Sequence, residues 1–267
     1  MPSIRAIYRY PVKGLSPEPL ERVALAPGLT LPNDRLYAIE NGPSGFNAAH
    51  PAHLPKQRFL MLMRNARLAA LRTRFEDANH ILTIVSPAAD GGAERAPPAV
   101  AADLRTPDGR AAVEQFFTSY CADELRGPPK ILRAEGHSFS DVARKVVSII
   151  NLASVAAVED MVGVRLDPLR FRGNVYMDGL PAWRELELVG SEMTIAPQHE
   201  GGKTARLKIV KRITRCAATN VDPARGIADL DIPRALMRAL GHADCGVYAE
   251  VIAGGAIAVG DRLEVAR

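Results

Sequence analysis

The stretch LKIVKRITRCAATNVDPARG, residues 207–226, contains the pattern from which the fold and the site are inferred. Its first seven residues alternate between apolar and basic side chains, which is typical of a β-strand with one buried face. In the Asp222-Pro223 turn, Asp bonds its own backbone, Pro fixes φ, and Gly226 accepts a positive φ. The stretch therefore predicts that Cys216 lies at the end of a rigid strand, directly after Arg215.

Cys216 has two interpretations. A thiol acts as a nucleophile or metal ligand only as the thiolate, which nearby positive charge favours. Arg215 supplies such a charge, and Lys211 and Arg212 lie close by in the sequence. The other interpretation is an inert, buried cysteine before an ordinary turn. The local sequence leaves both open.

Composition indicates an ordinary globular protein. A chain of 267 residues with 47% hydrophobic content can form one large or two modest domains with a real core. The formal net charge of +4 is mild, and the sequence contains no long block of Lys and Arg. Aromatic residues make up only 5%, which argues against base-stacking platforms. We therefore expect anionic small molecules, and no nucleic acid, as ligands.

The sequence also predicts a cytoplasmic protein with no membrane partner. The N-terminus enters a strand-like run at once and lacks the apolar region of a signal peptide. The longest uncharged apolar stretch, residues 146–158, is too short to cross a bilayer. Three cysteines without a CxxC pair favour a reducing compartment.

Short strands separated by turns are expected in a first domain, residues 1–129. Alternating or apolar runs predict them at residues 4–10, 23–25, 36–39, 59–63 and 81–85. A Pro- and Gly-rich composition predicts a long surface loop over 86–109, and helical spacing predicts a helix over 112–125. This pattern favours a small β-barrel or sandwich.

A second domain, residues 130–267, is also predicted to be mainly β. Its expected strands are residues 146–150, 185–189, 192–195, 246–251 and 262–265, and Gly254-Gly255 predicts a hairpin. Asn151 is predicted to cap a helix that ends at Gly163, and a short helix is expected over 230–240. The predicted fold class is mainly β with a few helices (α+β).

Two loops contain candidate anion-binding groups. In Pro11-Val12-Lys13-Gly14 an ammonium group lies beside flexible backbone N–H groups. In Arg170-Phe171-Arg172-Gly173-Asn174 two guanidinium groups bracket an aromatic ring, and such planar forks suit phosphate. Solvated side chains are the alternative in both loops, and each loop alone leaves the choice open.

Several standard sites have no support in the sequence. No GxGxxG or P-loop pattern predicts a dinucleotide or ATP site. His199-Glu200 lacks the second histidine of a zinc-protease helix. Residues 136–140 resemble a hydrolase elbow, but Ser140 replaces the glycine that such a turn requires.

Taken together, several short motifs resemble the MOSC family, and more closely its two-part members with an N-terminal β-barrel domain, including the mitochondrial amidoxime-reducing component and its bacterial relatives. The match covers nearly the whole chain, and it lies in the combination of the motifs rather than in any one of them. The motifs are Tyr10-Pro11-Val12-Lys13, Asp34-Arg35, residues 170–174, Arg215-Cys216 with Val221-Asp222-Pro223, and Gly260-Asp261.

The resemblance implies a β-barrel domain packed on a MOSC β-barrel domain, and a molybdenum cofactor (Mo-molybdopterin). By this likeness Cys216 would ligate molybdenum, and Asp222 would orient the Cys216 loop or face the substrate, although its turn position also explains it. The pterin and its phosphate would be held by Lys13, Gly14, Arg35, Arg170, Arg172, Asn174, Thr214 and Arg215. A soft thiolate suits such a metal, and clustered cations suit an oxyanion-rich ligand.

The resemblance implies an oxidoreductase that reduces N-hydroxylated or N-oxide compounds by oxygen-atom transfer. Two positions depart from many relatives, since Gly14 and Asn220 stand where serine and threonine are common. Because the chain has no cysteine cluster for an iron–sulfur domain, a separate electron-donor protein is expected. The alternatives are a cofactor carrier or sulfur-handling protein without turnover, and a metal-free anion-binding protein. The chain has too little room for the pyridoxal-phosphate domain of the sulfurases.

Overall fold

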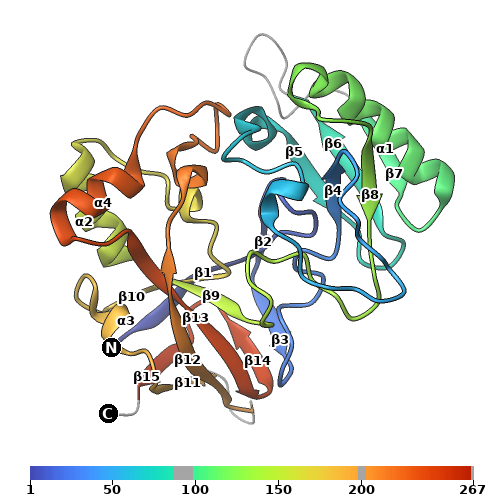
Figure 1. The fold of residues 1–267 in the computed structure, drawn as a ribbon. Coiled ribbons are helices and arrows are strands. Elements are labelled where there is room, and N and C mark those ends of the chain that lie inside the picture. Colours follow the sequence, from blue (N-terminus) through green and yellow to red (C-terminus); the bar gives the residue numbers. More distant parts are fainter. Residues whose placement is uncertain (87–98, 198–202, 266–267) are drawn as a thin grey trace.

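The structure is a computed structural model that describes residues 1–86, 99–197 and 203–265. Its largest unit is a closed seven-stranded barrel, seen at the lower left of Figure 1. Around the barrel the strands are β1 (Ser3–Arg9), β10 (Val175–Asp178), β9 (Val147–Asn151), β13 (Asp244–Ala253), β12 (Ala205–Thr214), β11 (Glu192–Ala196) and β15 (Arg262–Val265). The β1–β10 pairing closes it, and the alternating apolar side chains of these strands form its core.

The beginning of the chain completes this barrel. β1 pairs with β10, β15 and β2 (Glu18–Leu20), so the first residues lie among strands from the C-terminal half. β3 (Arg22–Leu25) pairs with β14 (Gly255–Ala258). The predicted Gly254-Gly255 hairpin is therefore wrong. These glycines instead allow close approach of other backbones, since a Cβ on Gly254 would lie 2.7 Å from the carbonyl oxygen of Leu25.

The second unit, at the upper right of Figure 1, consists of two small sheets and a helix. One sheet pairs β4 (Ala38–Asn41) with β8 (Pro129–Leu132), and the other contains β5 (Arg72–Phe75), β6 (Ile81–Val85) and β7 (Val100–Asp103). Helix α1 (Pro107–Tyr120) packs against β7 and β8. Its buried face presents Val113 and Phe117 to a core that also contains Tyr37, Leu68 and Leu82.

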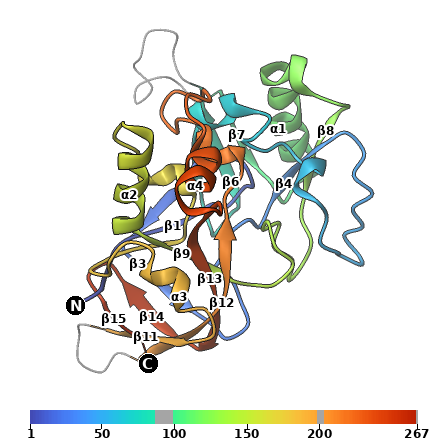
Figure 2. The same cartoon turned by 60° about the vertical axis from the view of Figure 1, so that its left-hand side comes forward.

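Three helices cover the barrel. α2 (Leu152–Val162) and α4 (Ile232–Leu240) pack side by side, as Figure 2 shows, and α3 (Arg184–Glu187) lies against β13. The side chain of Asn151 accepts a hydrogen bond from the N–H of Ala153 at the start of α2, and Gly163 ends α2 in the left-handed region, as predicted. The predicted fold class, mainly β with a few helices, is confirmed.

Two predicted strands are wrong. At residues 59–63 only Phe59 forms a β-bridge, and the chain then turns because Asn65 Oδ1 accepts the N–H of Met61. Residues 185–187 belong to α3, because Trp183 adopts a left-handed φ of 68° and starts a helical turn. Glu185 is fully buried there, where its carboxylate accepts hydrogen bonds from Asn151 and Ser154.

The predicted loop 86–109 is shorter than expected. β7 occupies residues 100–103, and α1 begins at Pro107 because Thr106 caps it through the N–H of Gly109. Residues 87–98, together with His199-Glu200, lie outside the described residues. In the part of the chain that is described, no helix is both long enough and apolar enough to cross a membrane.

The Asp222-Pro223 turn packs against the second unit through Gly226. This glycine has φ +66°, and a Cβ there would lie 2.9 Å from Cβ of Ala70. Gly163 has φ +73° with open space around it. We expect Gly163→Ala to cost about 1–2 kcal/mol for the left-handed backbone alone. Gly226→Ala should cost a further ~1–3 kcal/mol from overpacking. Urea unfolding of both variants measures the difference, and equal losses would contradict the proposed contact.

Candidate functional site

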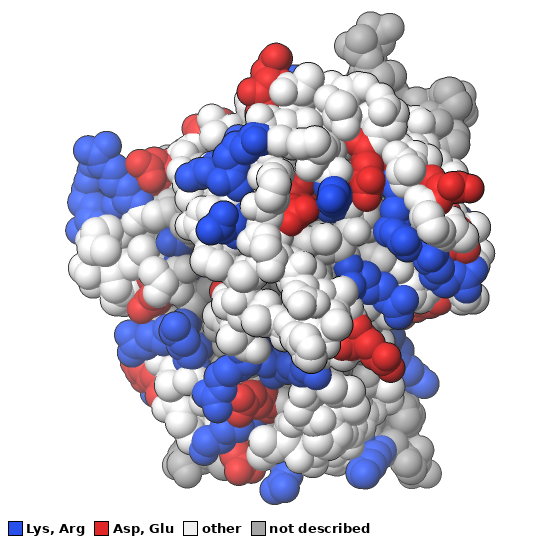
Figure 3. All heavy atoms as spheres, turned by 45° about the vertical axis from the view of Figure 1, so that its right-hand side comes forward, with Lys and Arg blue, Asp and Glu red and all other residues white. Residues whose placement is uncertain are grey.

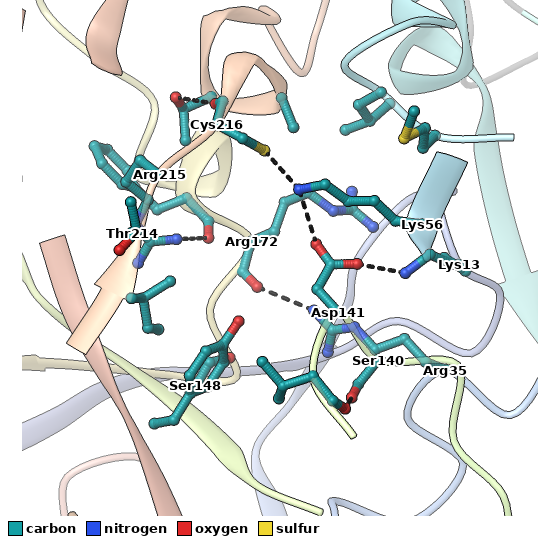
Figure 4. A pocket seen from close by; sticks show the side chains of 18 of the residues that line it. Lys13, Arg35, Lys56, Ser140, Asp141, Ser148, Arg172, Thr214, Arg215 and Cys216 are labelled. Atoms are coloured by element: carbon teal, nitrogen blue, oxygen red, sulfur yellow. Dashed lines mark hydrogen bonds and ion pairs between the residues drawn. The ribbon is translucent and has the colours of Figure 1, made fainter. Parts of the chain in front are cut away.

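A cavity of about 250 Å³ lies between the barrel and the second unit, and Figure 4 shows it from close by. Nine of the ten residues predicted for the site line this cavity. They are Lys13, Gly14, Arg35, Arg170, Arg172, Asn174, Thr214, Arg215 and Cys216. These residues are spread over some two hundred positions of the sequence, so tertiary structure alone brings them together.

Strand pairing explains how the segments meet. β1 and β10 are antiparallel, with Ile7 opposite Val175, so the residues that follow β1 lie beside those that precede β10. The hydroxyl of Tyr10 accordingly donates to the carbonyl of Gly173 at 3.2 Å. In the same way, the β12–β13 pairing places the N–H of Arg215 2.8 Å from the carbonyl oxygen of Ala243.

Cys216 lies where β12 ends and a single 3-10 turn, residues 217–220, begins. Its carbonyl accepts hydrogen bonds from the N–H and the hydroxyl of Thr219, which fix the backbone of this turn. The side chain is half-buried, and its Sγ accepts a hydrogen bond from Nζ of Lys56 at 3.1 Å (Figure 4). Of the two interpretations of Cys216, the structure supports an accessible thiol beside a cation.

The side chains of Thr214 and Arg215 donate hydrogen bonds to other groups of the protein. The Thr214 hydroxyl donates to Asp244 at 2.6 Å. Arg215 donates to the carbonyls of Cys245 and Phe171 at 2.7 and 2.8 Å, and its guanidinium lies 5.3 Å from the Phe171 ring centroid. These two residues therefore build the wall that carries Cys216.

Arg35 and Arg172 lie against one aromatic ring. Their guanidinium carbons are 4.5 and 4.3 Å from the ring centroid of Tyr10, which is fully buried. Both residues have a left-handed backbone, with φ of 51° and 50°. Such strain in non-glycine residues persists only where the surroundings enforce it, and it concentrates at functional sites.

The two arginines differ in their counter-ions. Arg35 forms an ion pair with Asp34, whereas Arg172 donates to the carbonyl of Leu15 at 2.9 Å and has no carboxylate partner in the described part of the chain. Burial, and then repulsion from Arg35, lower the pKa of Arg172 from its ordinary value. Arg172 is thus a partly buried cation that forms no ion pair within the described residues.

Arg170 has one unused donor. Its guanidinium donates to Asp229 at 2.8 and 3.1 Å and to the carbonyl of Asn220 at 2.9 Å. Its Nε is buried and is the one fully buried side-chain N or O atom of the described residues without a hydrogen-bond partner. An unsatisfied buried donor costs free energy, which makes this atom an exception among the described residues.

Lys13, Lys56 and Asp141 form a cluster opposite Cys216. Lys13 is buried and donates to the Phe139 carbonyl at 2.9 Å and to Asp141, and Lys56 lies 3.7 Å from Asp141 (Figure 4). Burial lowers the pKa of Lys13, an effect that Asp141 only partly opposes. The Asp141 side chain is 46% exposed; partial desolvation opposes its ionisation, yet the charges of Lys13 and Lys56 hold its pKa well below its usual range.

The sequence reasoning missed Lys56, Asp141 and Tyr248, which also line the cavity. Lys56 lies just before residues 59–63, which the sequence predicts as a strand, and Asp141 directly follows residues 136–140, which resemble a hydrolase elbow. Tyr248 lies within the predicted strand 246–251. Lys13 pairs with Asp141 across 128 positions, so no local signal could have linked them.

Asp222 does not line the cavity. Its Oδ1 accepts the N–H groups of Ala224 and Arg225 at 2.8 and 3.0 Å, as in a turn stabilised by its own aspartate. Its Oδ2 lies 2.9 Å from Arg225 and 3.6 Å from Arg170. The geometry therefore assigns Asp222 to the turn and to the support of Arg170.

Charged residues on the outer surface show no comparable concentration in the view that Figure 3 gives. Lys and Arg side chains are spread over that face and alternate with Asp and Glu. Among the side chains that line the cavity, eight are Lys or Arg and only two, Asp34 and Asp141, are acidic. The cavity is therefore the place where an anion would be attracted.

Without the Asp141 charge, the thermal stability of the protein should depend less on pH in the acidic range. The pKa of Asp141 is lower in the folded protein than in the unfolded chain. Its ion pairs therefore stabilise the fold above pH ~4, and this contribution is lost as the pH falls toward the folded-state pKa. We expect Asp141→Asn to lower the Tm at pH 7, and the difference from the parent protein to shrink below pH ~4. Thermal melts from pH 7 to pH 3 measure this, and a difference that grows with acid would contradict the assignment.

Comparison with known proteins agrees with this architecture. Residues 1–124 match the MOSC N-terminal beta barrel domain, and residues 134–264 match the MOSC domain. No curated protein matches the chain.

Two solved structures are similar to the chain. The YuaD protein from Bacillus subtilis has 14% sequence identity and a TM-score of 0.44, over 99% of this chain and 96% of that one. YiiM from Geobacillus stearothermophilus has 19% identity and a TM-score of 0.34, over 45% of this chain and 54% of that one. Because the two family matches together span almost all residues, the chain belongs to the MOSC family, with an N-terminal MOSC β-barrel domain followed by a MOSC domain.

Proposed function

We propose that this protein is a molybdenum-cofactor-dependent oxidoreductase that reduces N-hydroxylated or N-oxide compounds. The observation that carries the proposal is the cavity itself, where an accessible thiol lies among eight cations that the chain neutralises only in part. A thiolate is a soft ligand suited to molybdenum, and a pterin phosphate needs several charge-assisted donors.

The residues present fit such a cofactor. The unpartnered Nε of Arg170 and the guanidinium of Arg172, which forms no ion pair within the described residues, would supply donors for a phosphate. Gly14 lines the cavity with φ +85°, where a side chain would be strained, and a Cβ would lie 3.0 Å from the carbonyl oxygen of Leu60. Cys216 would hold the metal. When bound, this group supplies oxygen-atom-transfer redox chemistry.

The protein's own residues have three tasks in this reaction. Arg35 and Arg172 set the charge of the cavity, Thr214 and Arg215 fix the wall, and Lys56 faces the thiol. In the overall reaction an N-oxide, two electrons and two protons give the amine and water, so the N–O bond breaks and the oxygen leaves as water. A separate electron-donor protein would supply the electrons.

The cofactor and the thiol are tested together. Protein from a host that makes the cofactor should contain molybdenum and pterin in near-equal amounts, as elemental analysis and pterin fluorescence would show. Cys216→Ser should lose reduction of an N-hydroxylated base, because a hydroxyl replaces the soft ligand. Cys121→Ala, a change in the buried core of the second unit, is the control and should keep activity. Full activity in Cys216→Ser would refute the mechanism.

The same assay separates turnover from cofactor carriage. With an artificial electron donor, an enzyme consumes the N-oxygenated substrate. Equal cofactor content without any reduction would instead favour a carrier that passes the cofactor to another protein.

The arginine donors are tested by a change that keeps the charge. Arg170→Lys removes the Nε donor and the planar fork but retains a cation. A hydrogen bond to a charged group contributes ~1.5–3 kcal/mol, so pterin retention after gel filtration should fall about tenfold or more. Arg165→Lys is the matched control, because the Arg165 side chain is 97% exposed. Unchanged retention in Arg170→Lys would exclude Arg170 from the cofactor site.

A further inference from the structure

Tyr248 lies in the cavity wall with a hydroxyl that the fold does not use. On β13 it pairs with Lys211 of β12, and both side chains line the cavity. Its ring packs against the core beneath α2 and α4. Over residues 1–86, 99–197 and 203–265, its hydroxyl makes no hydrogen bond. A tyrosine that lines a cavity, with a packed ring and a hydroxyl that makes no hydrogen bond, can bind a ligand there.

Lys56 also keeps a donor for a ligand. An ammonium group has three N–H donors. One points to Sγ of Cys216 at 3.1 Å, and a second is directed to Asp141 at 3.7 Å. The side chain is 25% exposed and lines the cavity, and these two contacts leave its third donor unused. Asp141 is itself fixed by Lys13 and therefore holds the Lys56 ammonium beside the thiol.

Tyr248 and Lys56 share one electrostatic neighbourhood. Burial raises the pKa of Tyr248; the Asp141 carboxylate adds to this effect, and Arg215, Arg35 and Lys56 oppose it. Tyr248 therefore lines the same cavity as these cations. Across the cavity, Met61, Leu62 and Met63 form an apolar wall. A ligand with an electron-rich oxygen and an apolar body matches both sides.

We propose that Lys56 and Tyr248 form an oxyanion subsite beside Cys216, in which the ammonium and the hydroxyl bind one oxygen atom of the substrate. The subsite is separate from the donors of Arg170 and Arg172, and Asp141 is its positioning residue. That this oxygen is the N–O oxygen rests on the proposed function. The excess of cations further selects neutral or anionic N-oxygenated compounds with an apolar body over cationic ones.

The test uses the full chain without cofactor and nitrate as a small oxyanion. Iodoacetamide alkylates Cys216, and mass spectrometry of its peptide separates it from the buried Cys121 and Cys245. Nitrate in the subsite should slow this alkylation. The nitrate concentration for half-protection should rise about tenfold in Tyr248→Phe and in Lys56→Met, since each loses a hydrogen bond to an anion. Lys130→Met, an exposed change on β8, should leave it unchanged.

The nitrate concentration for half-protection is measured for each variant relative to its own alkylation rate without nitrate. A change in the intrinsic reactivity of Cys216 in Lys56→Met therefore does not affect it. No protection in the parent protein, or equal half-protection in Tyr248→Phe and the parent, would overturn the subsite. Either result together with a molybdenum-loaded protein that reduces an N-oxide would leave the proposed function standing. Nitrate protection in a protein that never acquires molybdenum would support the subsite and overturn the function.

Discussion

The gathering of like charges around one cavity is the constraint on which this structure depends. Eight lysines and arginines line a cavity that contains only two carboxylates, and two of the arginines lie against the same tyrosine ring. Such an arrangement costs free energy unless each charge has partners. The fold meets part of that cost with backbone carbonyls, as for Arg215 and Arg172, and with Asp34 and Asp141.

The barrel makes this convergence possible because it is closed by its first strand. β1 brings Tyr10 and Lys13 beside residues 170–174, and the β12–β13 pair carries Cys216 to the same cavity. The second unit contributes Lys56 and the apolar wall of Met61 and Met63. Neither unit alone presents both the thiol and the cations that face it. The site therefore belongs to the contact between them, and a change such as one at Gly226, where they touch, reaches it indirectly.

Local sequence patterns predicted the secondary structure correctly where neighbouring residues alone determine it. Asn151 and Gly163 bound a helix because cap geometry depends on a few neighbouring residues. It failed at residues 185–189, where alternating glutamate and leucine suggested a strand. There Glu185 is buried by hydrogen bonds to Asn151 and Ser154, more than thirty positions away. Gly254-Gly255 likewise accommodates a neighbouring strand instead of a hairpin, because the distant β3 competes for the pairing.

By itself the sequence determined the fold class, the strand that ends at Cys216 and the set of cationic loops, because strand alternation, turn chemistry and residue type are local properties. Tertiary structure decided which donors remain free. It committed Thr214 and Arg215 to the wall and Asp222 to a turn, left Arg170 Nε without a partner, and placed Lys56 and Tyr248 in the cavity. The reason is that a hydrogen-bond donor is available only if no acceptor lies nearby in space, and spatial neighbours are set by strand pairing across the whole chain.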